Sequence, residues 1–550
     1  MGAHPPLSRR LIAALRSHGA GEVFGIPGDF VLPFFDALEA DGELPYYTLS
    51  HEPSIGFAAD GAARIRSGIS AVVATYGAGA LNLANAVAVA YAEKSPVVVI
   101  AGAPGARERR GGLLVHHQAK RIDSQAAIFR EITCDQVRLD DPATAGADIS
   151  RVLASARRLS RPVYIEIPRD AFDEPCAEAG PCVAAPPAQE TVRACADDIL
   201  ARLGAARRAV MMAGVEVRRF GLEAEVAQLA QALGIPVVTS FMARGLFATG
   251  DAPLAGTYLG DAGDPAVADL VESSDALLLL GVIRSDTNFG TAPTHVDLEA
   301  AIHAFDGRVT LDGRDHADVP LGALVAEMLA RARTLSSARR AAPAPAPAGM
   351  PRDAAPVTPL DVATAINDLM AEHGRWPVAA DVGDCLFTAL DLVATDYVAP
   401  GFYASMGFAV PAALGIQAST GRRPIVLVGD GAFQMTGWEL GHCRRYGWDP
   451  IVVVLNNAGW RMLAAFRPGA HYAELGTWDF AGCAAPLGGI GWRVETRAQL
   501  ADALQAAART RGSFHLVDVR LAPGAVSERL TRFAAARVPR SYDPSRATAR

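Results

Sequence analysis

The chain has 550 residues, of which 50% are hydrophobic and 20% are charged, and its formal net charge is −8. At roughly 100–200 residues per domain, this length predicts about three domains, each able to bury its own core. The acidic balance argues against nucleic acid or an anionic membrane surface as a partner, and no apolar run approaches the roughly 20 residues that span a bilayer.

The N-terminal stretch SRRLIAALRSHG has apolar residues at helical spacing, and no long apolar region with a cleavage site follows it. Because the seven cysteines also include no CxxC pair, we expect reduced thiols in a cytoplasmic protein. The first third then alternates helical patterns with β-branched runs, which predict strands at Ala71–Gly77, Pro96–Gly102 and Pro162–Pro168.

The alternation continues with RAVMMAGVEV, IPVVTS, DALLLLGV and RVTLDG in the middle third, and with PVAADVGD, RRPIVLVGDG, DPIVVVLNN and FHLVDVR in the last. Such an order is typical of parallel sheets covered by helices. We therefore predict an α/β fold with three doubly wound parallel-sheet domains. The expected parts are an N-terminal domain at 1–180, a middle domain at 190–335, an Ala-Pro linker at 336–357, a C-terminal domain at 358–535 and a tail at 536–550.

The last third contains a motif in which two successive hydrophobic strands end in polar residues, first at Gly429-Asp430-Gly431 and then at Asn456-Asn457. In a right-handed βαβ unit the carboxyl ends of both strands share one edge of the sheet, so Asp430 and Asn457 should converge. A carboxylate and an amide oxygen suit Mg²⁺, and Gly431 allows an anion close to the start of a helix. The alternative is an aspartate that caps a helix and asparagines in a loop, but the combined spacing favours a metal–diphosphate site.

This motif resembles that of the thiamine diphosphate enzymes, and the likeness extends over essentially the whole chain. The resemblance implies a pyrimidine-binding, a middle and a diphosphate-binding domain, in that order. It also implies that Asp430, Asn457 and the carbonyl of Gly459 hold Mg²⁺ against the diphosphate of the cofactor. Further cofactor contacts are implied at Asp384, Ala404, Ser405, Met406, Gly429, Gly431, Ala432 and Trp460.

Within YASMGF, the resemblance implies that Met406 lies under the cofactor and bends it, while the carbonyl of Ala404 accepts from the 4′-amino group. Plain core packing is the alternative for Met406. In LSHEPSIGF, Glu52 stands just before a proline that suits a first helical turn, and alone it could merely complement a helix dipole. By resemblance, Glu52 instead hydrogen-bonds N1′ of the aminopyrimidine and so activates the cofactor.

Two adjacent histidines, His116 and His117, occur in GLLVHHQAK, where adjacent side chains cannot both face one core. Exposed surface residues are one interpretation. In the 2-oxo acid decarboxylase branch of the resembling family, however, such a pair lies over the active site together with an aspartate in PGDF, here Asp29. Decarboxylation requires a proton delivered to carbon and another removed from a hydroxyl, which histidine and aspartate can do.

One position departs from this branch: Leu463 in NNAGWRMLAAF stands where most relatives have a glutamate. The same change is familiar in bacterial phenylpyruvate and indolepyruvate decarboxylases. Leu463 and Phe466 would form an apolar pocket for an aromatic substrate, which Phe533 could close. Asp384 could supply the missing carboxylate.

We therefore expect a lyase that converts an aromatic 2-oxo acid, phenylpyruvate or indole-3-pyruvate, to the aldehyde and CO2 through a thiamine diphosphate enamine, with Mg²⁺. Its partners should be the small-molecule substrate and further copies of the chain in a homodimer or homotetramer, since the resemblance places Glu52 and the diphosphate site in different subunits. Two alternatives remain open at this stage. One is an acetolactate synthase-type carboligase, and the other is a non-catalytic thiamine diphosphate-binding protein.

Overall fold

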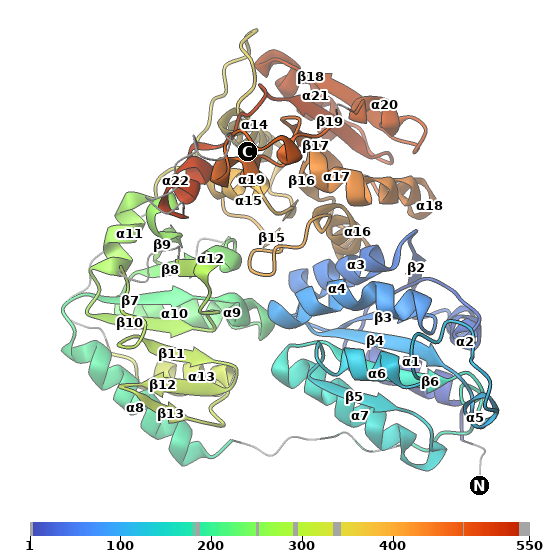
Figure 1. Ribbon diagram of the computed structural model, residues 1–550. Coiled ribbons are helices and arrows are strands. Elements are labelled where there is room, and N and C mark those ends of the chain that lie inside the picture. Colours follow the sequence, from blue (N-terminus) through green and yellow to red (C-terminus); the bar gives the residue numbers. More distant parts are fainter. Residues whose placement is uncertain are drawn as a thin grey trace, which may run out of the picture. The chain divides into compact units, whose positions relative to one another are not determined.

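The computed structural model describes residues 4–178, 180, 182, 187–248, 252–289, 295–333, 343–476 and 478–537 (Figure 1). Its internal contacts divide the chain into two units, one formed by Met1–Pro186 with Pro411–Arg422 and the other by Pro187–Val410 with Arg423–Arg550. Among the described residues, no helix combines the length and apolar character needed to cross a membrane.

The first unit contains a six-stranded sheet of order β2-β1-β3-β4-β6-β5, and every pair in it is parallel. The three strands predicted in this region are confirmed with ends shifted by a few residues, because their apolar runs are fully buried. The strands are β1 Val23–Gly25, β2 Tyr46–Thr48, β3 Ser70–Ala74, β4 Val97–Ala103, β5 Asp135–Arg138 and β6 Val163–Pro168.

Helices cover both faces of this sheet (Figure 1). Helices α1, α2 and α7 enclose one core, and α3, α4 and α6 lie against the other face. The helices are α1 Leu7–Ser17, α2 Leu32–Asp41, α3 Glu52–Ile65, α4 Ala78–Ala92, α5 Ala106–Arg110, α6 Ser124–Phe129 and α7 Pro142–Leu159, and α16 spans Ala409–Thr420.

The second unit begins with a seven-stranded sheet of order β13-β12-β11-β10-β7-β8-β9. Its strands are β7 Ala209–Ala213, β8 Val237–Ser240, β9 Leu254–Tyr258, β10 Ala276–Leu280, β11 Ile302–Phe305, β12 Arg308–Leu311 and β13 Arg314–His316. Its helices are α8 Gln189–Ala205, α9 Val215–Arg219, α10 Glu223–Leu233, α11 Pro265–Glu272, α12 Asp286–Phe289 and α13 Leu321–Arg331, with 3₁₀ turns η1 Phe241–Ala243 and η2 Gly260–Ala262.

One edge of this sheet differs from the parallel prediction, because β11, β12 and β13 pair antiparallel. The two connections are Asp306-Gly307 and Asp312-Gly313, and all four residues have positive φ. Two-residue Asp-Gly loops of this kind close tight hairpins whose twist matches the strands. The repeated Asp-Gly in FDGRVTLDGRDH was therefore a hairpin signal that the strand prediction at RVTLDG overlooked.

The second unit also contains a six-stranded, wholly parallel sheet of order β15-β14-β16-β17-β19-β18. Its strands are β14 Val378–Ala380, β15 Tyr397–Val398, β16 Ile425–Gly429, β17 Ile451–Asn456, β18 Ile490–Val494 and β19 His515–Arg520. Its helices are α14 Pro359–His373, α15 Asp384–Thr388, α17 Asp430–Thr436, α18 Cys443–Tyr446, α19 Arg461–Phe466, α20 Phe480–Ala484, α21 Arg497–Arg509 and α22 Glu528–Arg537, with 3₁₀ turns η3 Ala389–Asp391, η4 Gly437–His442 and η5 His471–Ala473.

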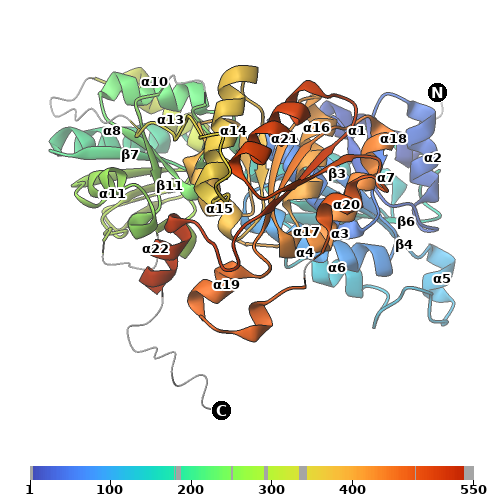
Figure 2. The same ribbon diagram turned by 90° about the horizontal axis from the view of Figure 1, so that it is seen from above.

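Part of the segment expected to be a linker packs against this last sheet. Met350 and Val357 are buried in its core, and the backbone N–H groups of Gly349 and Met350 donate to Asp368 on α14. Residues 336–342 of that linker, and residues 538–550 of the expected tail, lie outside the described residues. Near the C-terminal end of the described chain, α22 lies side by side with α19 (Figure 2).

Candidate active site

The polar strand ends of the last sheet meet as the sequence predicts. Strands β16 and β17 are parallel neighbours, with Gly429 opposite Leu455, so α17 starts beside the end of β17. Asp430 accepts hydrogen bonds from the backbone N–H of Gly431 at 2.8 Å and of Gly459 at 3.0 Å. Two loops that are far apart in sequence are thus joined through one carboxylate.

Asp430 is 3% exposed, and this burial raises the pKa of its carboxyl to about 6, although the neighbouring backbone N–H groups favour the charged form. Asn457 is also buried, and its Nδ2 donates to the carbonyl of Ala525 at 3.0 Å, which leaves Oδ1 for a ligand. A desolvated carboxylate beside an amide oxygen and the Gly459 carbonyl fits a hard divalent cation such as Mg²⁺.

Trp460 closes one side of this edge. Its buried indole Nε1 has no acceptor among the described residues, and a Cβ at Gly431 would lie only 2.4 Å from it. The close contact explains why glycine stands at 431, because any side chain there would displace the indole. An unused buried donor at this edge is what a bound acceptor such as a cofactor would satisfy.

The YASMGF segment is organised by a residue that sequence reasoning missed, Asp381 at the end of β14. Its carboxylate accepts from the backbone N–H of Gly407 at 3.1 Å and of Ala409 at 2.8 Å, and its burial raises its pKa to about 6. Met406 is only partly buried, whereas Phe408 two residues later is in the core, so this part of the segment presents Met406 rather than burying it. The signal for Asp381 was an aspartate directly after the strand in PVAADVGD.

Asp384 is 9% exposed, and both of its oxygens are used by Ser527 just before α22. The Ser527 N–H donates at 2.8 Å, the Ser527 hydroxyl makes a second short contact, and burial raises the pKa of Asp384. The structure therefore shows Asp384 holding the start of the last helix. Ser405 lies in the YASMGF segment with Ala404 and Met406. Gly429 ends β16 and Ala432 lies in α17, on either side of Asp430.

The three expected pocket residues differ in exposure. Leu463 on α19 is 47% exposed, whereas Phe533 on α22 is 4% exposed. Phe533 packs between Phe387, at 4.9 Å between ring centroids, and the partly buried Phe466, at 6.5 Å. The buried Phe533 thus packs against Phe466, whereas Leu463 is exposed to solvent.

In the first unit, Glu52 is the first residue of α3, and its Oε2 accepts from Nδ2 of Asn82 on α4 at 2.8 Å. Glu52 is partly buried, and Gly79, at the start of α4, leaves room beside its Oε1. The amide of Asn82 therefore orients the carboxyl group while leaving its other oxygen for a ligand.

Asp29, His116 and His117 lie together, as predicted. Nε2 of His116 is 2.7 Å from Oδ2 of Asp29, and the two imidazole rings are 4.9 Å apart. The buried ring of Phe30 packs against both histidines, at 4.9 Å and 6.3 Å. The three polar side chains are exposed, so they can exchange protons with solvent or with a bound ligand.

A buried polar cluster that was not predicted from the sequence binds Gly77, which lies close against the backbone of His117. Gln125 on α6 accepts from the Gly77 N–H at 2.6 Å and donates to the Tyr164 hydroxyl at 2.6 Å, and Tyr164 donates to Glu166. Tyr164 and Glu166 are two residues apart on β6 and so share a face. A glutamate inside the apolar PVYIEIP strand was the available signal.

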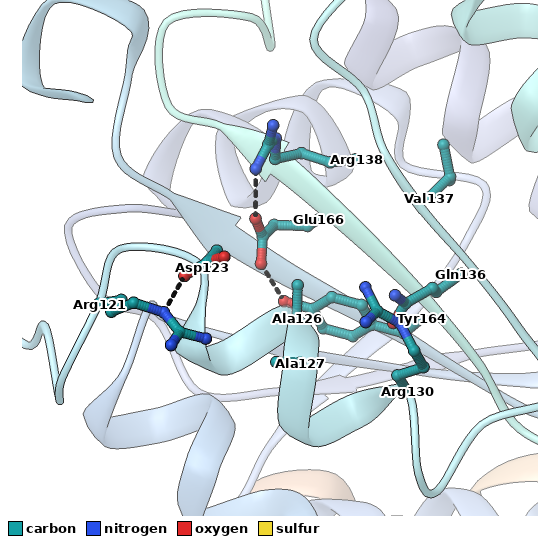
Figure 3. Close-up of a pocket in the computed structure, with 10 residues that line it drawn as sticks. All are labelled: Arg121, Asp123, Ala126, Ala127, Arg130, Gln136, Val137, Arg138, Tyr164 and Glu166. Carbon is teal, nitrogen blue, oxygen red and sulfur yellow. Dashed lines mark hydrogen bonds and ion pairs between the residues drawn. The ribbon is translucent and has the colours of Figure 1, made fainter. Parts of the chain in front are cut away.

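Figure 3 shows the pocket next to this cluster, a cavity of about 340 Å³, with Glu166 between Arg138 and Tyr164. Burial raises the pKa of Glu166, and Arg138, 4.0 Å away, partly offsets this effect. Arg121 pairs with Asp123 at 3.1 Å, to the left of Glu166 in this view. The link from this cluster to α6 is Gln125, which donates to both Tyr164 and Glu166.

Replacing Gly77 with alanine should disturb this loop specifically. Gly77 has φ +63°, and a Cβ there would lie 1.9 Å from the carbonyl oxygen of His117, whose own φ is +65°. The loop must therefore shift. From the proton-transfer role that the family resemblance implies for the histidine pair, we expect aldehyde formation to fall at least about tenfold, because reacting groups tolerate little displacement. Steady-state kinetics and cofactor affinity should both be measured. A native rate, or a loss of cofactor binding equal to the loss of rate, would contradict this prediction, and Gly42→Ala on the surface is the control.

Three family models match the chain, and together they define its class. They describe the N-terminal TPP binding domain of thiamine pyrophosphate enzymes at residues 6–128, the central domain at 196–332 and the C-terminal TPP binding domain at 381–519. These ranges fall on the three sheets, and they establish thiamine diphosphate (thiamine pyrophosphate) as the cofactor.

Individual relatives narrow the class. The chain is 52% identical over 531 residues to an indole-3-pyruvate decarboxylase of Azospirillum brasilense, covering 96% of this chain and 97% of that protein. It is 32% identical over 527 residues to an alpha-keto-acid decarboxylase of Mycolicibacterium paratuberculosis, and 31% identical over 539 residues to one of Mycobacterium tuberculosis, covering 93% of each chain in both cases. The chain belongs to the thiamine diphosphate-dependent 2-oxo acid decarboxylases, which are lyases. The predicted family, fold class and thiamine diphosphate cofactor are thereby confirmed, and Mg²⁺ stays a prediction.

Proposed function

We propose that this enzyme decarboxylates an aromatic 2-oxo acid, indole-3-pyruvate or phenylpyruvate, to the aldehyde and CO2, with Mg²⁺ as the metal. The observation that carries the proposal is the 52% identity, over almost the full length of both chains, to a protein named indole-3-pyruvate decarboxylase. The retained groups Glu52, Asp29, His116 and His117 support a catalytic protein over a non-catalytic one, and the histidine pair favours a decarboxylase over a carboligase.

The polar groups of the last sheet would bind the cofactor. Asp430 Oδ, Asn457 Oδ1 and the Gly459 carbonyl would hold Mg²⁺ against its diphosphate, and Trp460 Nε1 would donate to an acceptor at this edge. Glu52, oriented by Asn82, would hold a proton at a pyrimidine nitrogen. When bound, thiamine diphosphate supplies an electron sink for the carbanion left when CO2 departs.

The proton steps would fall to the triad of Asp29, His116 and His117. One proton must reach the former carbonyl carbon, and one must leave the hydroxyl before the aldehyde is released. The 2.7 Å contact between His116 and Asp29 lets a proton pass between these two groups, while His117 lies next to them. Because all three side chains are exposed, solvent can restore their protonation after each turnover.

We also propose a homodimer or homotetramer in the cytoplasm. Met435, Trp438 and Trp478 are 49%, 50% and 41% exposed, and the two tryptophan rings lie 6.2 Å apart, so they form an apolar patch suited to self-association. All seven cysteines are free thiols, as expected in a reducing compartment. Sedimentation of the full-length protein measures the oligomeric state.

The test of the main proposal is aldehyde formation by the full-length protein with thiamine diphosphate and Mg²⁺, using phenylpyruvate, indole-3-pyruvate and pyruvate. Higher kcat/KM for the two aromatic acids supports the proposal. Turnover of pyruvate alone would keep the decarboxylase chemistry and reject the aromatic substrate. No aldehyde from any of the three acids would reject the proposed reaction.

Substitution of Leu463 should shift this preference. Leu463→Glu places a charge on the exposed apolar position of α19, next to Phe466, and we expect kcat/KM for phenylpyruvate relative to pyruvate to fall about tenfold. The matched control is Leu463→Gln, which has nearly the size of glutamate without the charge. An unchanged ratio in the glutamate variant would remove Leu463 from the specificity of the enzyme.

A further inference from the structure

The triad of Asp29, His116 and His117 has a second chemical property besides proton transfer. Each residue offers one ligand atom, and the three atoms all lie within 4.8 Å of one another. Two imidazole nitrogens and one carboxylate oxygen form a donor set typical of Zn²⁺ and related transition metals. This set differs from the oxygen donors of Asp430, Asn457 and Gly459, which suit Mg²⁺.

We propose that the triad binds Zn²⁺ and that bound Zn²⁺ inhibits the enzyme by holding its proton-transfer groups. The binding site follows from the geometry alone, whereas the inhibition rests on the proposed function. On binding, Zn²⁺ replaces the proton between Nε2 of His116 and Oδ2 of Asp29. That proton is released to solvent.

The His116–Asp29 pair needs only a small movement to hold an ion. Nε2 of His116 and Oδ2 of Asp29 are 2.7 Å apart, and two ligands of a tetrahedral zinc lie roughly 3.3 Å apart at bond lengths of about 2.0–2.1 Å. The His116 and Asp29 side chains are 54% and 44% exposed, so they can open by this amount without repacking a core. The exposure also leaves a fourth coordination position for water.

The surroundings of the triad hold its members in place. The buried Phe30 ring contacts both imidazoles, and the backbone of His117 lies close against Gly77. Arg169 donates to Oδ2 of Asp29 at 3.5 Å and opposes a cation there, but its charge is balanced by an ion pair with Glu108. The three donors are thus already close together. Among the described residues, the guanidinium that contacts them, that of Arg169, is paired with Glu108.

The consequence is an inhibition that excess Mg²⁺ does not relieve. Zinc at the triad would occupy Asp29, His116 and His117 together, and it would leave the cation site at Asp430 to Mg²⁺. Aldehyde formation should therefore fall with Zn²⁺ occupancy while thiamine diphosphate remains bound.

The experiment is a Zn²⁺ titration of the full-length protein, loaded with thiamine diphosphate and saturating Mg²⁺. Zn²⁺ binding is measured by calorimetry. We expect about one Zn²⁺ per chain, with affinity reduced at least about tenfold in Asp29→Asn and in His117→Ala. The control variant His471→Ala removes an exposed histidine that pairs with Glu474 at 3.8 Å, and it should bind Zn²⁺ as the native protein does. Co²⁺ used in place of Zn²⁺ should give visible absorption bands that weaken in the same two triad variants.

Native Zn²⁺ affinity in both triad variants would overturn the proposal, and so would loss of Zn²⁺ binding in Asp430→Asn, since the ion would then lie in the Mg²⁺ site. The absence of Co²⁺ bands that depend on the triad would overturn it independently of any folding defect in a variant. A protein that forms no aldehyde yet binds Zn²⁺ through the triad would reject the proposed function and keep the metal site. Aldehyde formation with no triad-dependent Zn²⁺ binding would keep the proposed function and reject the metal site.

Discussion

Replacing Glu52 with glutamine is expected to lower kcat for every 2-oxo acid substrate by about 100- to 10,000-fold, with thiamine diphosphate still bound. Glutamine keeps the size of the side chain and can still accept from Asn82, which is 2.8 Å from Glu52 Oε2 in the native protein. It has no ionisable proton, however, so it cannot take the role that we propose for Glu52 at the cofactor. The measurement is kcat at saturating cofactor, together with the affinity for thiamine diphosphate by calorimetry.

The matched control is Glu39→Gln, which changes an exposed glutamate of the same unit that accepts one hydrogen bond from Tyr46 at 2.6 Å. This variant should retain the native rate. Asn82→Ala should fall between the two, since the carboxyl of Glu52 would persist but lose its orienting donor. An E52Q enzyme within about threefold of the native kcat would show that another group activates the cofactor.

Asp430→Asn should abolish tight binding of the metal and, with it, of the cofactor. The carboxylate is 3% exposed and accepts from two backbone N–H groups, so its charge is desolvated and available to a cation. Loss of that charge should weaken the affinity for Mg²⁺ by more than about 100-fold, beyond the usual effect of changing an outer partner. Because a bound ligand stabilises the folded state, the native protein should melt at a higher temperature with Mg²⁺ and thiamine diphosphate than without them.

The variant should show little or none of this increase, and its melting temperature without ligands should stay near the native value. Asp502→Asn serves as the control, because Asp502 is an exposed carboxylate on α21 whose ion pair is with Arg352. It should keep the full increase in melting temperature. A native-sized increase in Asp430→Asn would show that the cation binds elsewhere.

The residue pattern was enough to predict the GDG and NN strand ends and the parallel strands, except at the antiparallel edge formed by β11, β12 and β13. Strand identity is local, because apolar β-branched runs of a few residues must be buried wherever they occur. The meeting of Asp430 with the loop after Asn457 follows from the rule that parallel neighbours share their carboxyl edge, which needs no coordinates. The grouping of Asp29 and His116 came from family resemblance, since 87 residues separate them.

The sequence could not predict which polar groups already have hydrogen-bond partners within the fold. From the sequence, Asp384 is expected to supply a carboxylate to the site. In the structure its carboxylate binds Ser527, which is 143 residues away. Asp381 organises Gly407 and Ala409 in the same way, and Gln125 joins Gly77 to Glu166 through side chains on different elements. Such partners depend on how distant segments pack, because a buried polar group takes whichever partner the fold brings within about 3 Å, and residue spacing carries no record of that choice.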